Sequence, residues 1–208
     1  MRYSEYFAQP VKFLRLYYNY FLVRWGIRKV LPAYFINRIE VADCGEDLVQ
    51  YQDVWVRKRV AVMLDNAQRS LPPHFELKVV SGFRDSYVQR ALQVKFPDSR
   101  KVAAESGLAT GGAVDVILYY CGKEIDCGSE YLDFSPDTPT WSKGLNRQQQ
   151  RCRFILYNAM TAAGFINYPL EWWHFCYGDK MYAAYKFEKK AIYGKATIPW
   201  QPDLFKTE

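Results

Sequence analysis

Histidine is scarce in this chain of 208 residues, and its scarcity limits the chemistry that the protein can carry out. The sequence contains 2 histidines, His74 and His174. A metal centre or phosphorelay that needs three imidazoles from one chain is therefore excluded. Each histidine can be judged by its own surroundings.

Long apolar runs and cysteine pairs are also lacking. The longest apolar run, residues 16–23, is shorter than a membrane span and contains Asn19. No small-residue cleavage site follows it, so we expect no signal peptide. The 5 cysteines form no C-x-x-C pair, and their odd number means that they cannot all be paired in disulfides within the chain. We therefore expect reduced thiols in a cytoplasmic protein.

Hydrophobic residues (50%) and aromatic residues (17%) are plentiful, which excludes a disordered or coiled-coil protein. At this length one compact domain buries a core large enough to be stable without disulfide bonds or a structural metal ion. We predict a basic, aromatic helical extension over residues 1–38. A single domain is expected over residues 39–208.

Positive charge gathers near the N-terminus and contributes most of the net charge of +6. Residues 10–31 form a basic, aromatic pattern that fits a helix on an anionic membrane surface. The same pattern fits a helix that covers its own core, which we favour. The excess charge could attract nucleic acid, but a solvated basic face explains it equally well, and we expect no nucleic-acid partner.

Hydrophobic periodicity predicts a mixture of helices and short strands. The expected helices cover residues 54–71, 85–95 and 146–164, and the expected strands cover residues 75–79, 113–120 and 172–175. Asn146 with Gln149 three residues later matches a capping box at the start of the last helix. This mixture, without repeats, predicts an α+β fold.

Two segments place a charged side chain next to a predicted strand. Arg84 follows the first strand, and its planar guanidinium suits a carboxylate or a developing oxyanion, although a surface ion pair is the commoner role. Asp115 lies inside the second strand among apolar neighbours. A carboxylate there is costly unless it is hydrogen-bonded or bound to a cation, and the alternative is an aspartate that caps a loop.

A third segment, residues 171–175, holds Glu171 and His174 among bulky aromatic residues. Aromatic surroundings should restrict solvent and make the carboxylate a stronger base. The three-residue spacing puts the two side chains on opposite faces of an ideal strand. Glu171 must therefore lie on the turn before the strand if both are to meet one ligand. The alternative is a buried structural histidine beside a solvated glutamate.

Together the three segments resemble the D-alanyl-D-alanine dipeptidases of the vancomycin-resistance type, which are zinc peptidases of the hedgehog/DD-peptidase superfamily. The family signatures are S-x-H-x-x-G-x-A-x-D, E-x-x-W-H and an earlier G-[YF]-R. They correspond here to residues 106–115, to a shifted match at residues 171–174, and to residues 82–84. The resemblance extends from about Ile39 to about Tyr185. It implies a small central antiparallel sheet flanked by helices, and a hydrolase acting on cell-wall peptidoglycan dipeptides.

The resemblance also implies roles for individual residues. Asp115 and His174 match two of the three zinc ligands of the family. Glu171 matches its catalytic base, and Arg84 matches the group that stabilises the transition state. The predicted substrate-binding residues are Ser106, Asp133 and Trp173.

Two positions depart from the family pattern. Leu108 stands where the family has its first zinc-ligating histidine, and a leucine cannot coordinate a cation. The family's F-D-x-F segment corresponds to residues 131–134, where Asp133 comes one position late. Cys176 is a candidate substitute ligand because it shares a strand face with His174, and Asp115 would complete that site. A buried cysteine is more often a small hydrophobe.

Three hypotheses about function follow. The chain could be a metallopeptidase that acts on a small D-amino-acid dipeptide through an incomplete or atypical zinc site. It could be a pseudoenzyme that binds such a dipeptide without hydrolysis. It could also use Glu171, His174 and Arg84 for metal-free acid–base chemistry on another substrate.

Overall fold

The computed structural model describes Ile36 and residues 39–95 and 107–198, apart from the side chains of residues 92, 93 and 95. Apart from Ile36, the predicted extension over residues 1–38, with its membrane-surface alternative, lies outside the described residues, and so does the predicted site residue Ser106. The helices are α4 (Lys58–Ser70), α5 (Ser86–Lys95), α6 (Arg147–Ala162) and α7 (Lys180–Lys186), with a 3-10 turn, η1, at Gly107–Thr110. The strands are β1 (Glu40–Val41), β2 (Leu48–Tyr51), β3 (Val54–Arg57), β4 (Phe75–Ser81), β5 (Ala113–Tyr120), β6 (Lys123–Glu124), β7 (Ile166–Asn167), β8 (His174–Cys176) and β9 (Lys190–Ala191).

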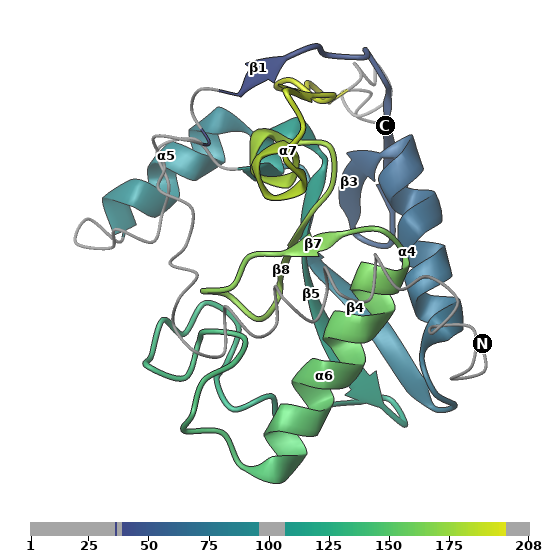
Figure 1. Cartoon of the computed structure of the whole chain (residues 1–208), viewed down its shortest axis with the longest axis vertical. Coiled ribbons are helices and arrows are strands. Elements are labelled where there is room, and N and C mark those ends of the chain that lie inside the picture. Colours follow the sequence, from purple (N-terminus) through teal and green to yellow (C-terminus); the bar gives the residue numbers. More distant parts are fainter. Residues whose placement is uncertain (1–35, 37–38, 96–106, 199–208) are drawn as a thin grey trace, which may run out of the picture.

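A five-stranded antiparallel sheet forms the centre of the fold (Figure 1). Its strand order is β4-β5-β8-β7, and β6 pairs with the far end of β5. The first six residues of β5 are buried, as expected of a strand with neighbours on both edges. The predicted α+β fold with a small antiparallel sheet is confirmed.

Helices α4 and α6 pack on the sheet and build the main core (Figure 1). On α4, Val60, Met63, Leu64 and Ala67 are buried at the i, i+3, i+4, i+7 spacing of an amphipathic helix. They belong to one hydrophobic cluster with Val114, Val116, Ile117 and Leu118 of β5. Each large aliphatic side chain buried there contributes about 1.5–3 kcal/mol.

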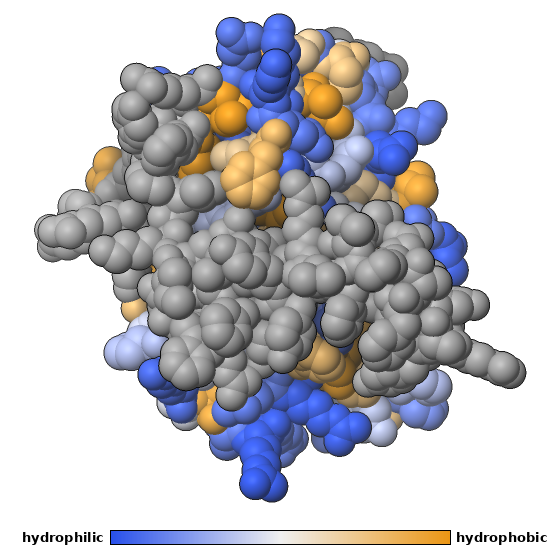
Figure 2. Space-filling view, in the orientation of Figure 1, coloured by the Kyte–Doolittle hydropathy of each residue, from blue (hydrophilic) through white to orange (hydrophobic). Residues whose placement is uncertain are grey.

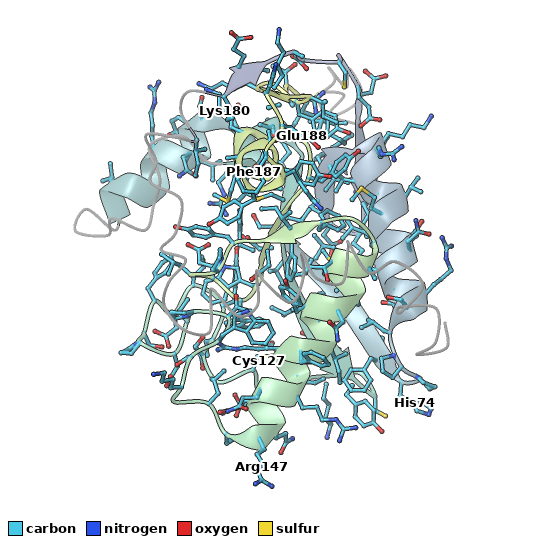
Figure 3. The ribbon with its side chains drawn as sticks, viewed as in Figure 1. His74, Cys127, Arg147, Lys180, Phe187 and Glu188 are labelled. Atoms are coloured by element: carbon cyan, nitrogen blue, oxygen red, sulfur yellow. The ribbon has the colours of Figure 1, made fainter. Side chains whose placement is uncertain are left out.

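The start of α6 is fixed by the predicted capping box. Asn146 Oδ1 accepts a hydrogen bond from the Gln149 backbone N–H at 2.9 Å, and Gln149 Oε1 accepts one from the Asn146 N–H at 3.0 Å. These bonds satisfy donors that the first turn of a helix leaves unpaired. Figure 2 shows hydrophilic residues gathered at the lower edge of this face, where α6 begins at the Arg147 labelled in Figure 3.

Two predicted boundaries were wrong. Residues 54–57 form strand β3, paired with β2, and the helix begins only at Lys58. The Val-Trp-Val sequence there favours a pleated strand, which overrides the helical spacing of Val56. The third strand begins at His174, because Trp172 and Trp173 lie on the preceding turn.

All five cysteines are free thiols. Among the helices that the structure describes, none is long and apolar enough to cross a membrane.

Candidate functional site

The strand register gathers the three charged segments at one end of the sheet. On β5, Asp115 lies directly opposite His174 on β8 and opposite Ser81 at the end of β4. Side chains that face each other across antiparallel strands project from the same side of a sheet. Arg84 follows Ser81 by three residues and so reaches the same place.

The buried carboxylate of Asp115 is the centre of this cluster, with 3% of the residue exposed. Its Oδ1 lies 2.7 Å from Nδ1 of His174. Its Oδ2 accepts a hydrogen bond from the Tyr131 hydroxyl at 3.0 Å, and Arg84 Nη2 lies 3.8 Å from the same oxygen. Both oxygens therefore have partners and a guanidinium offsets the charge, as a buried carboxylate requires.

Arg84 is held in place from three sides. Its Nη2 donates to Ser81 Oγ at 3.0 Å, and its Nη1 donates to Gln89 Oε1 at 3.3 Å. Its backbone N–H donates to the carbonyl of Leu108 at 3.2 Å. The side chain keeps 15% of its surface exposed. Arg84 is thus a fixed positive group that stays partly accessible to solvent.

Glu171 lies on the turn before β8, where its spacing to His174 required it. The Glu171 N–H donates to the Tyr168 carbonyl at 3.1 Å, and the His174 N–H donates to the Glu171 carbonyl at 3.2 Å. Burial, followed by the negative charge of Glu171, raises the pKa of Tyr168 to about 12. The Tyr168 ring stands edge-on to the His174 ring at 6.1 Å, so Tyr168 lies near both the predicted base, Glu171, and the predicted ligand, His174.

Leu108 sits in η1, on the same side of the sheet. The turn is fixed by Arg57, whose Nε donates to the Thr110 carbonyl at 2.7 Å. Leu108 is 2% exposed and forms a small hydrophobic cluster with Ala113 and Cys176. Leu108, which the resemblance aligns with a zinc-ligating histidine, therefore contributes an apolar wall to this side of the sheet.

Cys176 lies beside His174 but on the opposite edge of the imidazole from Asp115. Its Sγ is 3.3 Å from His174 Nε2 and 3.7 Å from the Met181 Sδ. Burial, followed by the charge of Asp179, raises the pKa of the Cys176 thiol to about 12. The thiol is therefore protonated at neutral pH and is not an exposed nucleophile.

The zinc implied by the family resemblance does not fit these donors. Leu108 offers no ligand, and zinc sites use at least three protein ligands. Asp115 contacts Nδ1 of His174, and Cys176 contacts Nε2 on the other side of the ring. An ion bound to one of these nitrogens therefore cannot also bind both Asp115 and Cys176. Within the described part of the chain, no group of three or more His, Cys, Asp or Glu side chains is placed to hold a metal ion.

Other predicted site residues lie elsewhere. Trp173 is 1% exposed and packs edge-on to Tyr131 inside the core. Asp133 is exposed on the loop before α6. His74, the other histidine, is exposed and precedes β4 at the end of the sheet away from the cluster, at the lower right of Figure 3.

Sequence reasoning missed three residues that complete the site: Tyr131, Gln89 and Tyr168. Tyr131 had a signal, because it begins the segment that corresponds to the family's F-D-x-F and carries a hydroxyl where the family has phenylalanine. Gln89 lies on the helix that follows Arg84, and Tyr168 lies before a proline. No pattern in the sequence marks either as a partner.

Comparison with known proteins agrees with the family resemblance of the sequence motifs. The sequence profile described as D-ala-D-ala dipeptidase matches residues 44–192. A D-alanyl-D-alanine dipeptidase from Synechocystis sp. is 33% identical over 88 residues, covering 36% of this chain and 35% of that protein. Those from Enterococcus faecium and Escherichia coli are each 27% identical over 48% of this chain, covering 50% and 54% of their own lengths. The alignments thus span about half or less of these relatives. Since the profile covers most of the chain, this protein belongs to the D-ala-D-ala dipeptidase family.

Proposed function

We propose that this chain is a dipeptidase-like protein that takes a small dipeptide of the D-alanyl-D-alanine class at the Arg84–Asp115–His174 cluster. One observation carries the proposal. The strand register brings these three side chains together from segments far apart in the sequence, with Glu171 on the adjoining turn. The names of the relatives support the same substrate class.

In this proposal Arg84 and Glu171 act on the dipeptide. Arg84 is fixed by Ser81 and Gln89, and its guanidinium would stabilise negative charge on the oxygen of the peptide carbonyl. Glu171 would accept a proton from an attacking water. Asp115 and Tyr131 act indirectly, because their hydrogen bonds fix the His174 ring.

Hydrolysis by these groups alone is expected to be slow. A positioned general base contributes about 10²–10⁴-fold, and one oxyanion donor about 10²–10³-fold. Family members with a complete zinc set add a Lewis-acid contribution of several kcal/mol. Leu108 removes a ligand from that set.

A second candidate function is binding of the dipeptide without hydrolysis. The self-contained pairing of Asp115 with His174, Tyr131 and Arg84 favours it, because this carboxylate needs no cation to be stable in its buried position. Such a protein would sense or sequester the dipeptide.

Alanine release and dipeptide binding, measured together, test both candidates. The wild-type chain is compared with Leu108→His, which restores the ligand, and with Leu108→Asn, a polar control that does not. Binding with zinc-independent turnover in the wild type supports the first candidate. Binding without turnover, and zinc-dependent turnover only in Leu108→His, supports the second. If the wild type and Leu108→His are folded and neither binds D-alanyl-D-alanine in preference to L-alanyl-L-alanine, the proposal is wrong.

A further inference from the structure

We propose that His174, Cys176 and Met181 form a binding site for a soft monovalent cation of the Cu(I) class. This inference goes beyond dipeptide binding and does not depend on it. Imidazole, thiol and thioether groups are the donors that Cu(I) prefers, and hard divalent ions prefer oxygen.

Two of the three donor–donor distances are close to those around a three-coordinate ion. Cys176 Sγ lies 3.3 Å from His174 Nε2 and 3.7 Å from Met181 Sδ. Bonds of ~2.0 Å to nitrogen and ~2.3 Å to sulfur place neighbouring ligand atoms ~3.6–4.0 Å apart. Adjustments of a few tenths of an ångström would admit the ion, which replaces the thiol proton between Sγ and Nε2.

The backbone holds these three donors on one side of the sheet. His174 and Cys176 are two residues apart on β8, so their side chains share a face. Met181 lies in the first turn of α7, which is capped by the Asp179 side chain accepting from the Tyr182 N–H at 2.7 Å. A short connection thus brings the thioether over the thiol.

Asp115 orients the imidazole for this role. Its Oδ1 lies 2.7 Å from Nδ1, which directs the other ring nitrogen towards the sulfur. A carboxylate on the outer nitrogen of a ligating histidine is a recurrent feature of metal sites, since it fixes the ring and increases its basicity.

The surroundings select a soft, weakly hydrated ion. Leu108 and Ala113 pack against Cys176, and Ile166 and Tyr182 pack against the same cluster. A hydrated Mg²⁺ or Ca²⁺ would lose its water here without gaining oxygen ligands. Leu108 cannot ligate zinc, but its apolar side chain packs against Cys176 and would keep water away from a thiolate–thioether site.

A buried carboxylate oxygen lies next to this cluster. Among the described residues, Oδ2 of Asp179 has no hydrogen-bond partner, and Asp179 is 2% exposed. Its charge acts on the Cys176 thiol, so the two groups are close. The other oxygen of this carboxylate accepts from the Tyr182 N–H, so its buried charge is only partly compensated, and a cation beside Cys176 would offset the remaining cost.

Cu(I) titration of the metal-free full chain without oxygen, against a chromophoric chelator, tests the proposal. Because four other thiols are present, the reference protein is Cys44→Ser/Cys121→Ser, which removes the two exposed ones. We expect this reference to keep one tight Cu(I) site and to show a higher melting temperature with Cu(I) or Ag(I). In the same background, Met181→Leu should weaken binding by about tenfold or more, and Cys176→Ala should abolish the tight site.

Spectroscopy and a second variant keep the result interpretable. X-ray absorption of the loaded protein should show two sulfur ligands and one nitrogen ligand. Met181→Leu conserves volume, so its fold should survive even if Cys176→Ala does not. The proposal would be overturned if Met181→Leu bound Cu(I) as tightly as the reference protein. It would also be overturned if the reference protein, which lacks only the two exposed thiols, had no tight Cu(I) site. Dipeptide binding measured in the same variants shows whether the proposed function stands or fails separately.

Discussion

At the scale of single residues, the sequence predicted that a charged group would be buried, but it did not predict that group's hydrogen-bond partners. Asp115 in an apolar strand had to be paired, and it is. Its partners Tyr131 and His174 lie 16 and 59 residues away in the chain. Contacts of that range depend on strand register and loop course, which local patterns do not encode.

The same limit applies to the contacts of Cys176. Its two-residue spacing from His174 correctly predicted a shared face. The spacing did not show that Asp115 would take the other ring nitrogen, or that Met181 would approach the sulfur from α7. Asp115 and Cys176 thus contact opposite sides of the His174 ring, and the joint site of the three residues stays a prediction.

Gly112 is a residue-scale test of how tightly this side of the sheet is packed. A Cβ added there would lie 2.4 Å from the Tyr177 carbonyl oxygen, and that backbone cannot move freely because its N–H donates to the Gly112 carbonyl. We expect Gly112→Ala to lower the free energy of unfolding by about 3 kcal/mol.

The matched control for this change is Gly194→Ala. The nearest atoms there belong to the half-exposed side chain of Asp43, which can turn away. Urea unfolding followed by tryptophan fluorescence measures both variants. Equal, small effects would show that the approach of Tyr177 to Gly112 is not as close as described.

At the scale of elements, prediction succeeded where the signal was local. Strand β5 has the predicted bounds, and α6 begins at the predicted capping box because hydrophobic pattern and cap chemistry agree there. Residues 54–57 were assigned wrongly because helical spacing and strand-forming side chains coincide over four residues. Only pairing with β2 decides between them.

The capping box gives a prediction at this scale. Asn146→Ala removes the side chain that accepts from the Gln149 N–H, so a donor in the first turn of α6 loses its partner. We expect a loss of about 1 kcal/mol in the free energy of unfolding. Thermal unfolding measures it. Gln148→Ala, at an exposed position in the same turn, should change stability by much less, and an equal loss in both would contradict the capping account.

At the scale of the whole molecule, Arg153 ties the long loop between β6 and α6 to the rest of the fold. Its guanidinium donates to the carbonyls of Cys127 at 2.6 Å and Pro139 at 2.7 Å, and it lies over the Trp172 ring. Burial lowers the pKa of Arg153 to about 10, so it is charged at neutral pH. The loop that it holds also carries Tyr131 to the candidate site.

Arg153→Leu should therefore destabilise the whole protein. The change leaves two carbonyls without a donor, and we expect a loss of about 3 kcal/mol in the free energy of unfolding. Calorimetry measures the shift in melting temperature. Arg151→Leu, on an exposed part of the same helix, is the control, and a similar shift for both variants would disprove the anchoring role.

The central claim is that the family's dipeptide site persists although its zinc set is incomplete. Calorimetric titration of D-alanyl-D-alanine into the metal-free full chain tests it most directly, with Arg84→Met as the matched variant. The account predicts saturable binding by the wild type and at least about tenfold weaker binding by Arg84→Met, since a charged contact is lost. No binding by the folded wild type, or equal binding by Arg84→Met, would contradict it.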